Sequence, residues 1–99
     1  MNDDDLIKAV HAALEKDRIA RQARDELDDI QERLATLTPR EREVLTHVVS
    51  GQLNKQIAFD LGTVEKTIKV HRARVMEKMK VQSVAELVRL TERLKARTE

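Results

Sequence analysis

Apolar residues from position 37 onward recur at helical spacing, in short clusters that glycine separates. Gly51 follows the first cluster and Gly62 follows the second. Because a period near 3.6 residues marks one face of a helix, the pattern predicts helix, turn, helix, turn, helix. The three clusters in chain order are Val44, Leu45 and Val48, then Ile57, Ala58 and Leu61, then Ile68, Val75 and Met79.

Short-range signals set the bounds of the first of these helices. Thr38 is a capping residue, Pro39 suits the first helical position, and Glu41 stands three residues after the cap. Gly51 is free to adopt the left-handed conformation that ends many helices. We therefore predict a helix from Pro39 to about Ser50.

The following helices carry weaker signals. Asn54 is placed to cap a second helix up to about Leu61, and Gly62 makes the turn into the third. Ser83 and Glu86 repeat the capping pattern before a fourth helix. That helix carries the apolar residues Val84, Leu87, Val88, Leu90 and Leu94.

The segment from Asp4 to about Ala35 has neither glycine nor proline and predicts one long helix, with Asp3 to Asp5 favourably placed at its start. Two interpretations stay open: a coiled-coil linker, or a solvated helix whose packing partner is absent. The apolar first turns also resemble one helix of a larger domain. A coiled-coil seam would run through Leu6, Val10, Ala13, Asp17, Ala20, Arg24, Leu27, Ile30, Leu34 and Leu37.

Composition agrees with an all-α fold, since the chain has two Gly, one Pro, one aromatic residue and 37% charged residues. The absence of Cys excludes disulfides and thiolate metal sites. No apolar run reaches the roughly 20 residues of a membrane helix, and the first residues are acidic where a signal peptide is basic. We expect a cytoplasmic protein with no membrane segment, metal or cofactor.

Charge divides the chain in two. Residues 1–36 hold six basic and ten acidic residues, whereas residues 37–99 hold thirteen and eight. We therefore predict an N-terminal helix or linker at residues 1–36 and a binding domain at residues 37–99. Only the second is suited to a polyanion, because its third helix carries six basic residues against two acidic ones: Lys66, Lys69, Arg72, Arg74, Lys78 and Lys80 against Glu65 and Glu77.

A helical wheel of the third helix separates a core face from a groove-facing face. With about 100° per residue, Ile68, Val75 and Met79 share one side, together with Arg72. The opposite side contains Lys69, Val70 and Ala73, which we predict to read bases. Lysine can donate to guanine, and short apolar side chains pack on a thymine methyl group.

Phosphate contacts are predicted from the flanks of that face and from the start of the second helix. For any single basic residue, the alternative to a DNA contact is an ordinary solvated side chain. For the whole basic face, we favour DNA contact over that alternative. The predicted phosphate contacts are Asn54, Lys55, Lys66, Thr67 and Lys78. His71 lies beside the core, and we interpret it as a packed, hydrogen-bonded histidine.

Several motifs together resemble a known family. They are Leu37-Thr38-Pro39-Arg40-Glu41-Arg42-Glu43-Val44-Leu45, Asn54-Lys55-Gln56-Ile57-Ala58, Lys66-Thr67-Ile68-Lys69-Val70-His71 and Val75-Met76-Glu77-Lys78-Met79. This segment resembles the DNA-binding domain of the LuxR/FixJ family of bacterial transcription regulators. The Val70-His71-Arg72 signature resembles the FixJ-like response regulators in particular.

The resemblance implies a long N-terminal helix followed by a four-helix LuxR-type helix-turn-helix domain. It implies base reading by Lys69, Val70 and Ala73, and a final receiver helix and linker at the N-terminus. It also implies the output domain of a two-component response regulator. One position departs from the family, which commonly has Ser where this chain has Val64. Either Thr63 replaces it as the cap, or the helix start is frayed.

The apolar arc of the fourth helix is wider than a small core needs, about 160° against roughly 100°. The surplus predicts a two-fold contact between protomers, which is also how the family uses this helix. The predicted dimerisation residues are Val84, Leu87, Leu90, Thr91 and Leu94.

Three functions follow from these patterns. We favour a sequence-specific transcription regulator that binds two-fold sites on double-stranded DNA as a dimer, with RNA polymerase as a further candidate partner. The alternatives are a promoter reader similar to sigma-factor region 4 and a helical protein-interaction module. No pattern indicates an activated nucleophile or a phosphate-binding glycine loop, so we expect neither an enzyme nor a small-molecule ligand.

Overall fold

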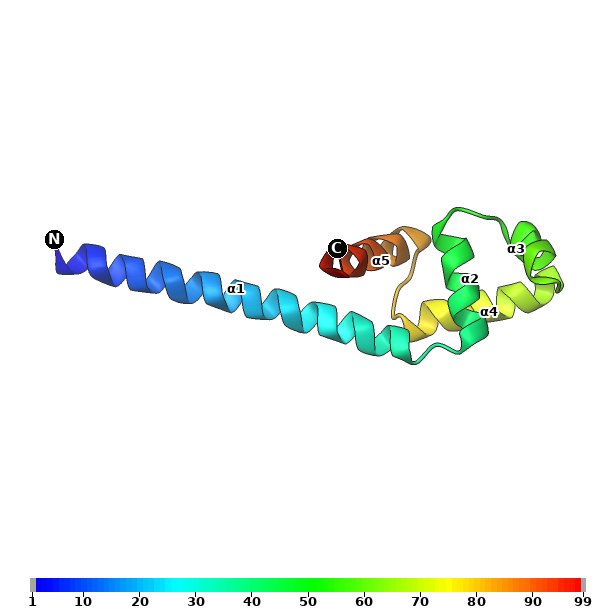
Figure 1. The fold of residues 1–99 in the computed structure, drawn as a ribbon, viewed down its shortest axis with the longest axis horizontal. Coiled ribbons are helices and arrows are strands. Elements are labelled where there is room, and N and C mark those ends of the chain that lie inside the picture. Colours follow the sequence, from blue (N-terminus) through cyan, green and yellow to red (C-terminus); the bar gives the residue numbers. More distant parts are fainter. Residues whose placement is uncertain (1, 99) are drawn as a thin grey trace.

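The computed structural model describes residues 2–98, which form five α-helices and no strand (Figure 1). Together they measure 70 × 23 × 21 Å, because the first helix extends far beyond the others. The helices are α1 (Asp3–Ala35), α2 (Pro39–Val49), α3 (Asn54–Leu61), α4 (Glu65–Lys78) and α5 (Val84–Thr98). The predicted all-α fold, with a long N-terminal helix before four shorter ones, is confirmed.

Helix α1 is stabilised by groups along its own length. The Asn2 side chain accepts a hydrogen bond from the Asp4 amide at 3.1 Å, and the three aspartates of the first turn favour the positive end of the helix dipole. Near the other end, Arg33 pairs with Asp29 at 2.6 Å. Because α1 has these local interactions and contains neither glycine nor proline, it forms one uninterrupted helix.

The two halves of α1 have different surroundings. Apolar side chains of the first half are between 49% and 62% exposed: Leu6, Ile7, Val10, Leu14 and Ile19. In the second half Ile30 is buried in the core, and Leu27 and Leu34 pack against it. The division at residue 36 stays a prediction, but the packed core includes residues that precede it.

The core forms where α2 and α3 pack against α4 and where α5 closes the remaining side. The buried apolar residues are Ile30, Leu37, Val44, Leu45, Val48, Ile57, Ala58, Ile68, Val75, Met79, Val81 and Leu87. Both glycines adopt the left-handed conformation at the predicted turns, with φ of 89° at Gly51 and 68° at Gly62. Within residues 2–98, no helix is long and apolar enough to cross a membrane.

A buried carboxylate joins the start of α2 to the end of α4. Glu41 completes the predicted capping box, because its Oε1 accepts from the Thr38 amide at 2.9 Å and its own amide donates to Thr38 Oγ1. The same Oε1 lies 2.7 Å from the Lys78 ammonium, and the Glu41 side chain is only 2% exposed. Lys78 also donates to the Thr36 carbonyl at 3.2 Å.

The hydrogen bond from Lys78, and then that from the Thr38 amide, hold the pKa of Glu41 below its usual value of 4.5, against the opposing effect of burial. A carboxylate whose pKa is lowered by folding stabilises the fold above its unfolded-state pKa. That stabilisation is lost as the pH falls through the folded-state pKa.

Helix α5 lies beside the second half of α1 (Figure 1). Arg93 pairs with Glu26 at 2.9 Å, and Arg97 pairs with Asp28 at 2.8 Å. Ser83 accepts from the Glu86 amide, as the capping pattern predicts. The Glu86 carboxylate, however, accepts from the Gln82 amide.

We predict that Glu41→Gln lowers the free energy of unfolding by about 1–3 kcal/mol at neutral pH, since Lys78 then loses its buried anionic partner. The difference in unfolding free energy from the unmodified protein should narrow as the pH falls from 4.5 toward the lowered pKa of Glu41, below which the native carboxylate is also protonated. Chemical denaturation at a series of pH values measures both effects.

The matched control is Glu43→Gln, which removes an exposed carboxylate from the same helix; Glu43 pairs with Arg40 at the surface. It should change stability by no more than about 0.5 kcal/mol at any of these pH values. Equal decreases in the free energy of unfolding of the two variants would show that the buried Glu41 contributes no more to stability than an exposed carboxylate.

Candidate nucleic-acid interface

The outward face of α4 carries the residues predicted to read bases. Lys69, Val70 and Ala73 are all exposed, whereas Ile68 and Val75 on the opposite side are buried. The wheel therefore separated the buried side of α4 from the exposed side correctly. Because packing fixes one side of α4, the other side is held rigidly at the surface, as a recognition helix requires.

The start of α4 has backbone amides without partners. Val64 is the residue before the first helical position, and its side chain makes no capping hydrogen bond. Thr63 does not take over the cap, because the helix begins at Glu65 without a shift. The amides of Glu65 and Lys66 remain free to donate to an anion.

Helix α3 brings two further predicted contacts beside α4. Asn54 is the first residue of α3 and not its cap, which corrects the sequence prediction, and its side chain is half-buried. Gln56 satisfies the preceding Leu53 amide through its side-chain oxygen at 2.9 Å. Lys55 is exposed.

The basic residues predicted to contact phosphate are in different environments. The ammonium groups of Lys55 and Lys66 have no bonding partner among residues 2–98, and Thr67 is half-buried. Lys78 differs, because Glu41 and the Thr36 carbonyl already bind its ammonium. Its phosphate contact stays a prediction, and its substitution would test stability as much as binding.

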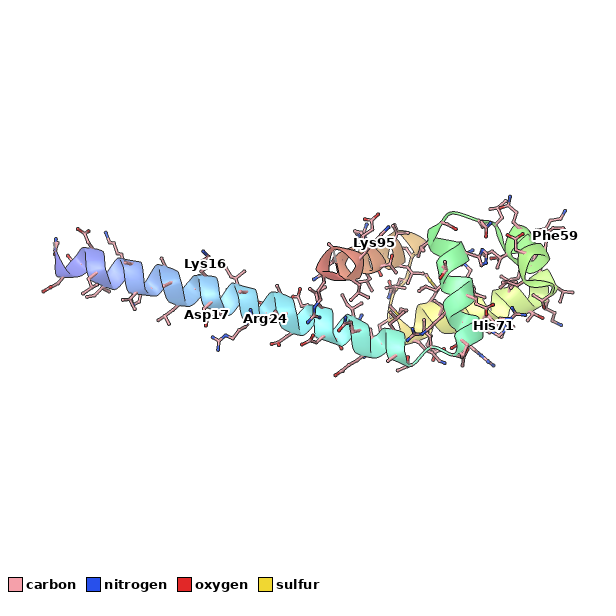
Figure 2. The ribbon with its side chains drawn as sticks, in the orientation of Figure 1. Lys16, Asp17, Arg24, Phe59, His71 and Lys95 are labelled. Carbon is pink, nitrogen blue, oxygen red and sulfur yellow. The ribbon has the colours of Figure 1, made fainter. Side chains whose placement is uncertain are left out.

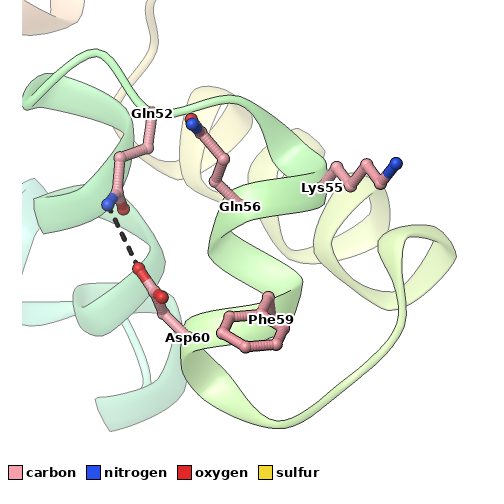
Figure 3. A pocket seen from close by; sticks show the side chains of 5 residues that line it. All are labelled: Gln52, Lys55, Gln56, Phe59 and Asp60. Carbon is pink, nitrogen blue, oxygen red and sulfur yellow. Dashed lines mark hydrogen bonds between the residues drawn. The ribbon is translucent and has the colours of Figure 1, made fainter.

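The connection between α2 and α3 is held by a chain of polar side chains. His47 Nδ1 bonds to Gln52 Oε1, and Gln52 Nε2 donates to Asp60 at 3.1 Å (Figure 3). These residues link the end of α2 to the body of α3. The link fixes the loop that precedes Asn54 and Lys55.

Phe59 is the sole aromatic residue of the chain, and it is 86% exposed. It lies at the end of the molecule far from the N-terminus (Figure 2). Together with Gln52, Lys55, Gln56 and Asp60 it lines a depression of about 370 Å³ (Figure 3). No pattern in the sequence predicts this exposure.

His71 is half-buried on α4, as its position beside the core predicts. The expected hydrogen bond is wrong for one ring nitrogen, because Nδ1 is buried without a partner. Packing therefore fixes this side chain more than hydrogen bonding does.

The predicted dimerisation residues separate into two groups. Leu87 is fully buried in the core of its own chain, and Val84, Leu90 and Leu94 pack against that core. Leu87 therefore cannot contact a second protomer without opening the domain. Thr91 instead lines a surface depression of about 250 Å³ with Val49, Val88, Glu92 and Lys95.

This fold and surface match a known family. The model for bacterial regulatory proteins of the LuxR family matches residues 35–91. The chain belongs to this family. The matched segment is the helix-turn-helix DNA-binding domain that the sequence motifs predicted.

Two relatives and one solved structure illustrate the similarity. Nodulation protein W of Bradyrhizobium diazoefficiens is 42% identical over 92 residues, which are 93% of this chain and 40% of that protein. Transcriptional regulatory protein FixJ of Rhizobium meliloti is 47% identical over 85 residues, 86% of this chain and 42% of FixJ. The structure of the response regulator StyR superposes with a TM-score of 0.85 at 40% identity, covering 93% of this chain and 46% of StyR.

The chain thus spans less than half the length of the curated relatives it matches. Its similarity covers α1 as well as the family domain, since more than nine-tenths of the chain superposes on StyR. Most residues of α1 therefore have counterparts in the structure of StyR.

Sequence reasoning missed the side-chain pairs that hold the interface together. Arg72 Nη1 donates to Asn54 Oδ1 at 3.0 Å, and Lys78 reaches Glu41. Both pairs connect residues that are distant in the chain. A signal did exist for Arg72, because a charged residue on a core face requires a partner.

We predict that Lys69→Ala weakens binding to the preferred DNA site by about 1–3 kcal/mol, and binding to random DNA much less. The fold should persist, because the Lys69 side chain is exposed and without a partner in the described chain. Fluorescence anisotropy on both duplexes measures the difference. An equal loss of affinity for the preferred and the random duplex would show that Lys69 contacts phosphate and not bases.

Proposed function

We propose that this protein is a sequence-specific regulator of transcription that inserts α4 into the major groove of DNA. The observation that carries the proposal is the exposure of Lys69, Val70 and Ala73 on one face of a helix whose opposite face is buried. A rigid helix with basic and short apolar side chains outward is suited to reading base edges.

Contacts with the DNA backbone come from both helices of the motif. Lys55 and Lys66 offer free ammonium groups, and the start of α4 offers the unpaired amides of Glu65 and Lys66. Asn54 and Thr67 add polar side chains at the two helix starts. Such contacts set the register of the domain on the duplex, whereas α4 supplies the specificity.

Two protomers bind adjacent half-sites related by two-fold symmetry. The depression beside Val88 and Thr91 is the part of α5 that the chain's own core leaves available for this contact. Its area is modest, so the dimer forms mainly on DNA, where neighbouring half-sites raise the effective concentration of each protomer.

In the whole protein this domain is the output part of a two-component response regulator, as the similarity to StyR supports. The exposed apolar side chains in the first half of α1 favour an additional protein contact there. RNA polymerase is the partner through which a DNA-bound regulator would alter transcription, and the cytoplasm is where it would act.

Selection of bound sequences from a random DNA pool tests the proposal. The expected result is a narrow consensus with two-fold symmetry. The logarithm of the affinity for it should fall linearly with the logarithm of the salt concentration. A protein-interaction module would enrich no sequence, and the proposal would then be wrong. Recovery of a single asymmetric motif would contradict the proposed dimer but would still show sequence-specific binding.

The dimer contact is tested with a charge on α5. Val88→Glu should abolish cooperativity between two half-sites while leaving affinity for a single half-site within about twofold, because it faces the depression and not the core. Titration of full and half sites by gel shift gives both quantities.

The matched control is Ala85→Glu, which adds the same charge to an exposed position of the same helix. It should keep cooperativity. Leu90→Glu serves as a contrast, because it should lower the melting temperature through lost core packing. Unchanged cooperativity in Val88→Glu would exclude this face of α5 as the contact.

A further inference from the structure

Arg72 occupies an unexpected position for a charged residue of a recognition helix. It lies on the side of α4 that Ile68 and Val75 bury, and it is itself half-buried. Its guanidinium crosses to α3, where Nη1 donates to Asn54 Oδ1 at 3.0 Å. The bond is partly buried and joins the two helices of the DNA-binding motif.

This bond fixes which end of the Asn54 amide is available. The carboxamide has one acceptor oxygen and one donor NH₂ group. Because Arg72 occupies the oxygen, the Nδ2 donor is left, and it has no acceptor among residues 2–98. A donor at this place is suited to an anionic group, such as a backbone phosphate of DNA.

Without Arg72 the Asn54 side chain has a competing arrangement. Asparagine near a helix start readily forms local hydrogen bonds between its side-chain oxygen and nearby unpaired backbone amides. The first amides of α3 are of this kind, since the preceding Leu53 has no side chain that can cap them. The hydrogen bond from Arg72 to Oδ1 prevents this rotation of the Asn54 side chain and leaves Nδ2 available to a ligand.

The position of the guanidinium also has an electrostatic cost in the free protein. Arg72 places a positive charge at the start of α3, which is the positive end of the helix dipole and carries the exposed Lys55 as its second residue. A DNA phosphate beside Asn54 would relieve that repulsion. The arrangement is therefore better matched to the bound state than to the free state.

The geometry points to Arg72 as a positioning residue for DNA binding: it holds Asn54 so that Nδ2 donates to a phosphate, and it thereby couples the backbone register of α3 to the base-reading face of α4. The inference rests on the proposed function and assigns to Arg72 an action through Asn54.

The experiment is a double-mutant cycle on the full chain with Arg72→Met, Asn54→Ala and the combined variant. The DNA is a duplex recovered by selection with the unmodified protein, and anisotropy gives the affinities. Each single change should weaken binding about tenfold, the effect of a lost hydrogen bond to a charged group. In the Asn54→Ala background, Arg72→Met should then change affinity by less than about twofold.

Asn54→Asp provides a variant that separates positioning from folding. Its carboxylate still accepts from Arg72 and suits a helix start, so the melting temperature should equal or exceed that of the unmodified protein. It lacks the NH₂ donor and repels phosphate, so DNA affinity should fall by about tenfold or more. Undiminished affinity in this variant would show that Nδ2 makes no contact with phosphate.

Two results would overturn the inference while the proposed function stands. One is an equal effect of Arg72→Met in both backgrounds, which would show that Arg72 acts without Asn54. The other is undiminished binding by Asn54→Asp. If the unmodified protein binds no DNA at all, the proposed function fails first, and the positioning by Arg72 fails with it.

Discussion

The burial of one face of α4 is the constraint on which the rest of this structure depends. Ile68 and Val75 are almost completely inaccessible, and α2 and α3 pack against α4 to cover them. A helix with several positive charges would gain little from forming alone, so tertiary packing supplies its stability. The same packing holds Lys69 and Ala73 outward on a rigid support.

Electrostatic contacts hold the helices together where they cross once the apolar face is covered. Glu41 is buried where α2 meets the end of α4, and Lys78 is the cation that neutralises it. Arg72 similarly ties α4 to the first residue of α3. Basic side chains on α4 therefore fall into two groups. Some are used inside the domain, and others, such as Lys66, stay free for a polyanion.

Helix α1 is joined to the domain through α5 and, at its C-terminal end, also through the end of α4, where Arg33 donates to the Met79 carbonyl at 3.1 Å. Arg93 and Arg97 pair with acidic residues of α1, and Ile30 enters the core near the same place. The acidic charge of the first segment thus lies beside basic residues of α5, away from Lys69. A movement of α1 would act on α5, which carries the surface proposed for dimerisation, and also on the end of α4, which Arg33 contacts.

Local patterns in the sequence determined the helices, their turns and the two faces of α4. The capping box at Thr38, the left-handed Gly51 and the buried Ile68 follow from interactions within a few residues, which a linear pattern records. The tertiary structure alone decided that Lys78 binds Glu41 and that Leu87 belongs to the core, since both depend on where distant helices cross. Helical periodicity indicates which side of a helix is apolar but not which other helix covers it. The partners of charged residues on that side therefore emerge only when the helices pack.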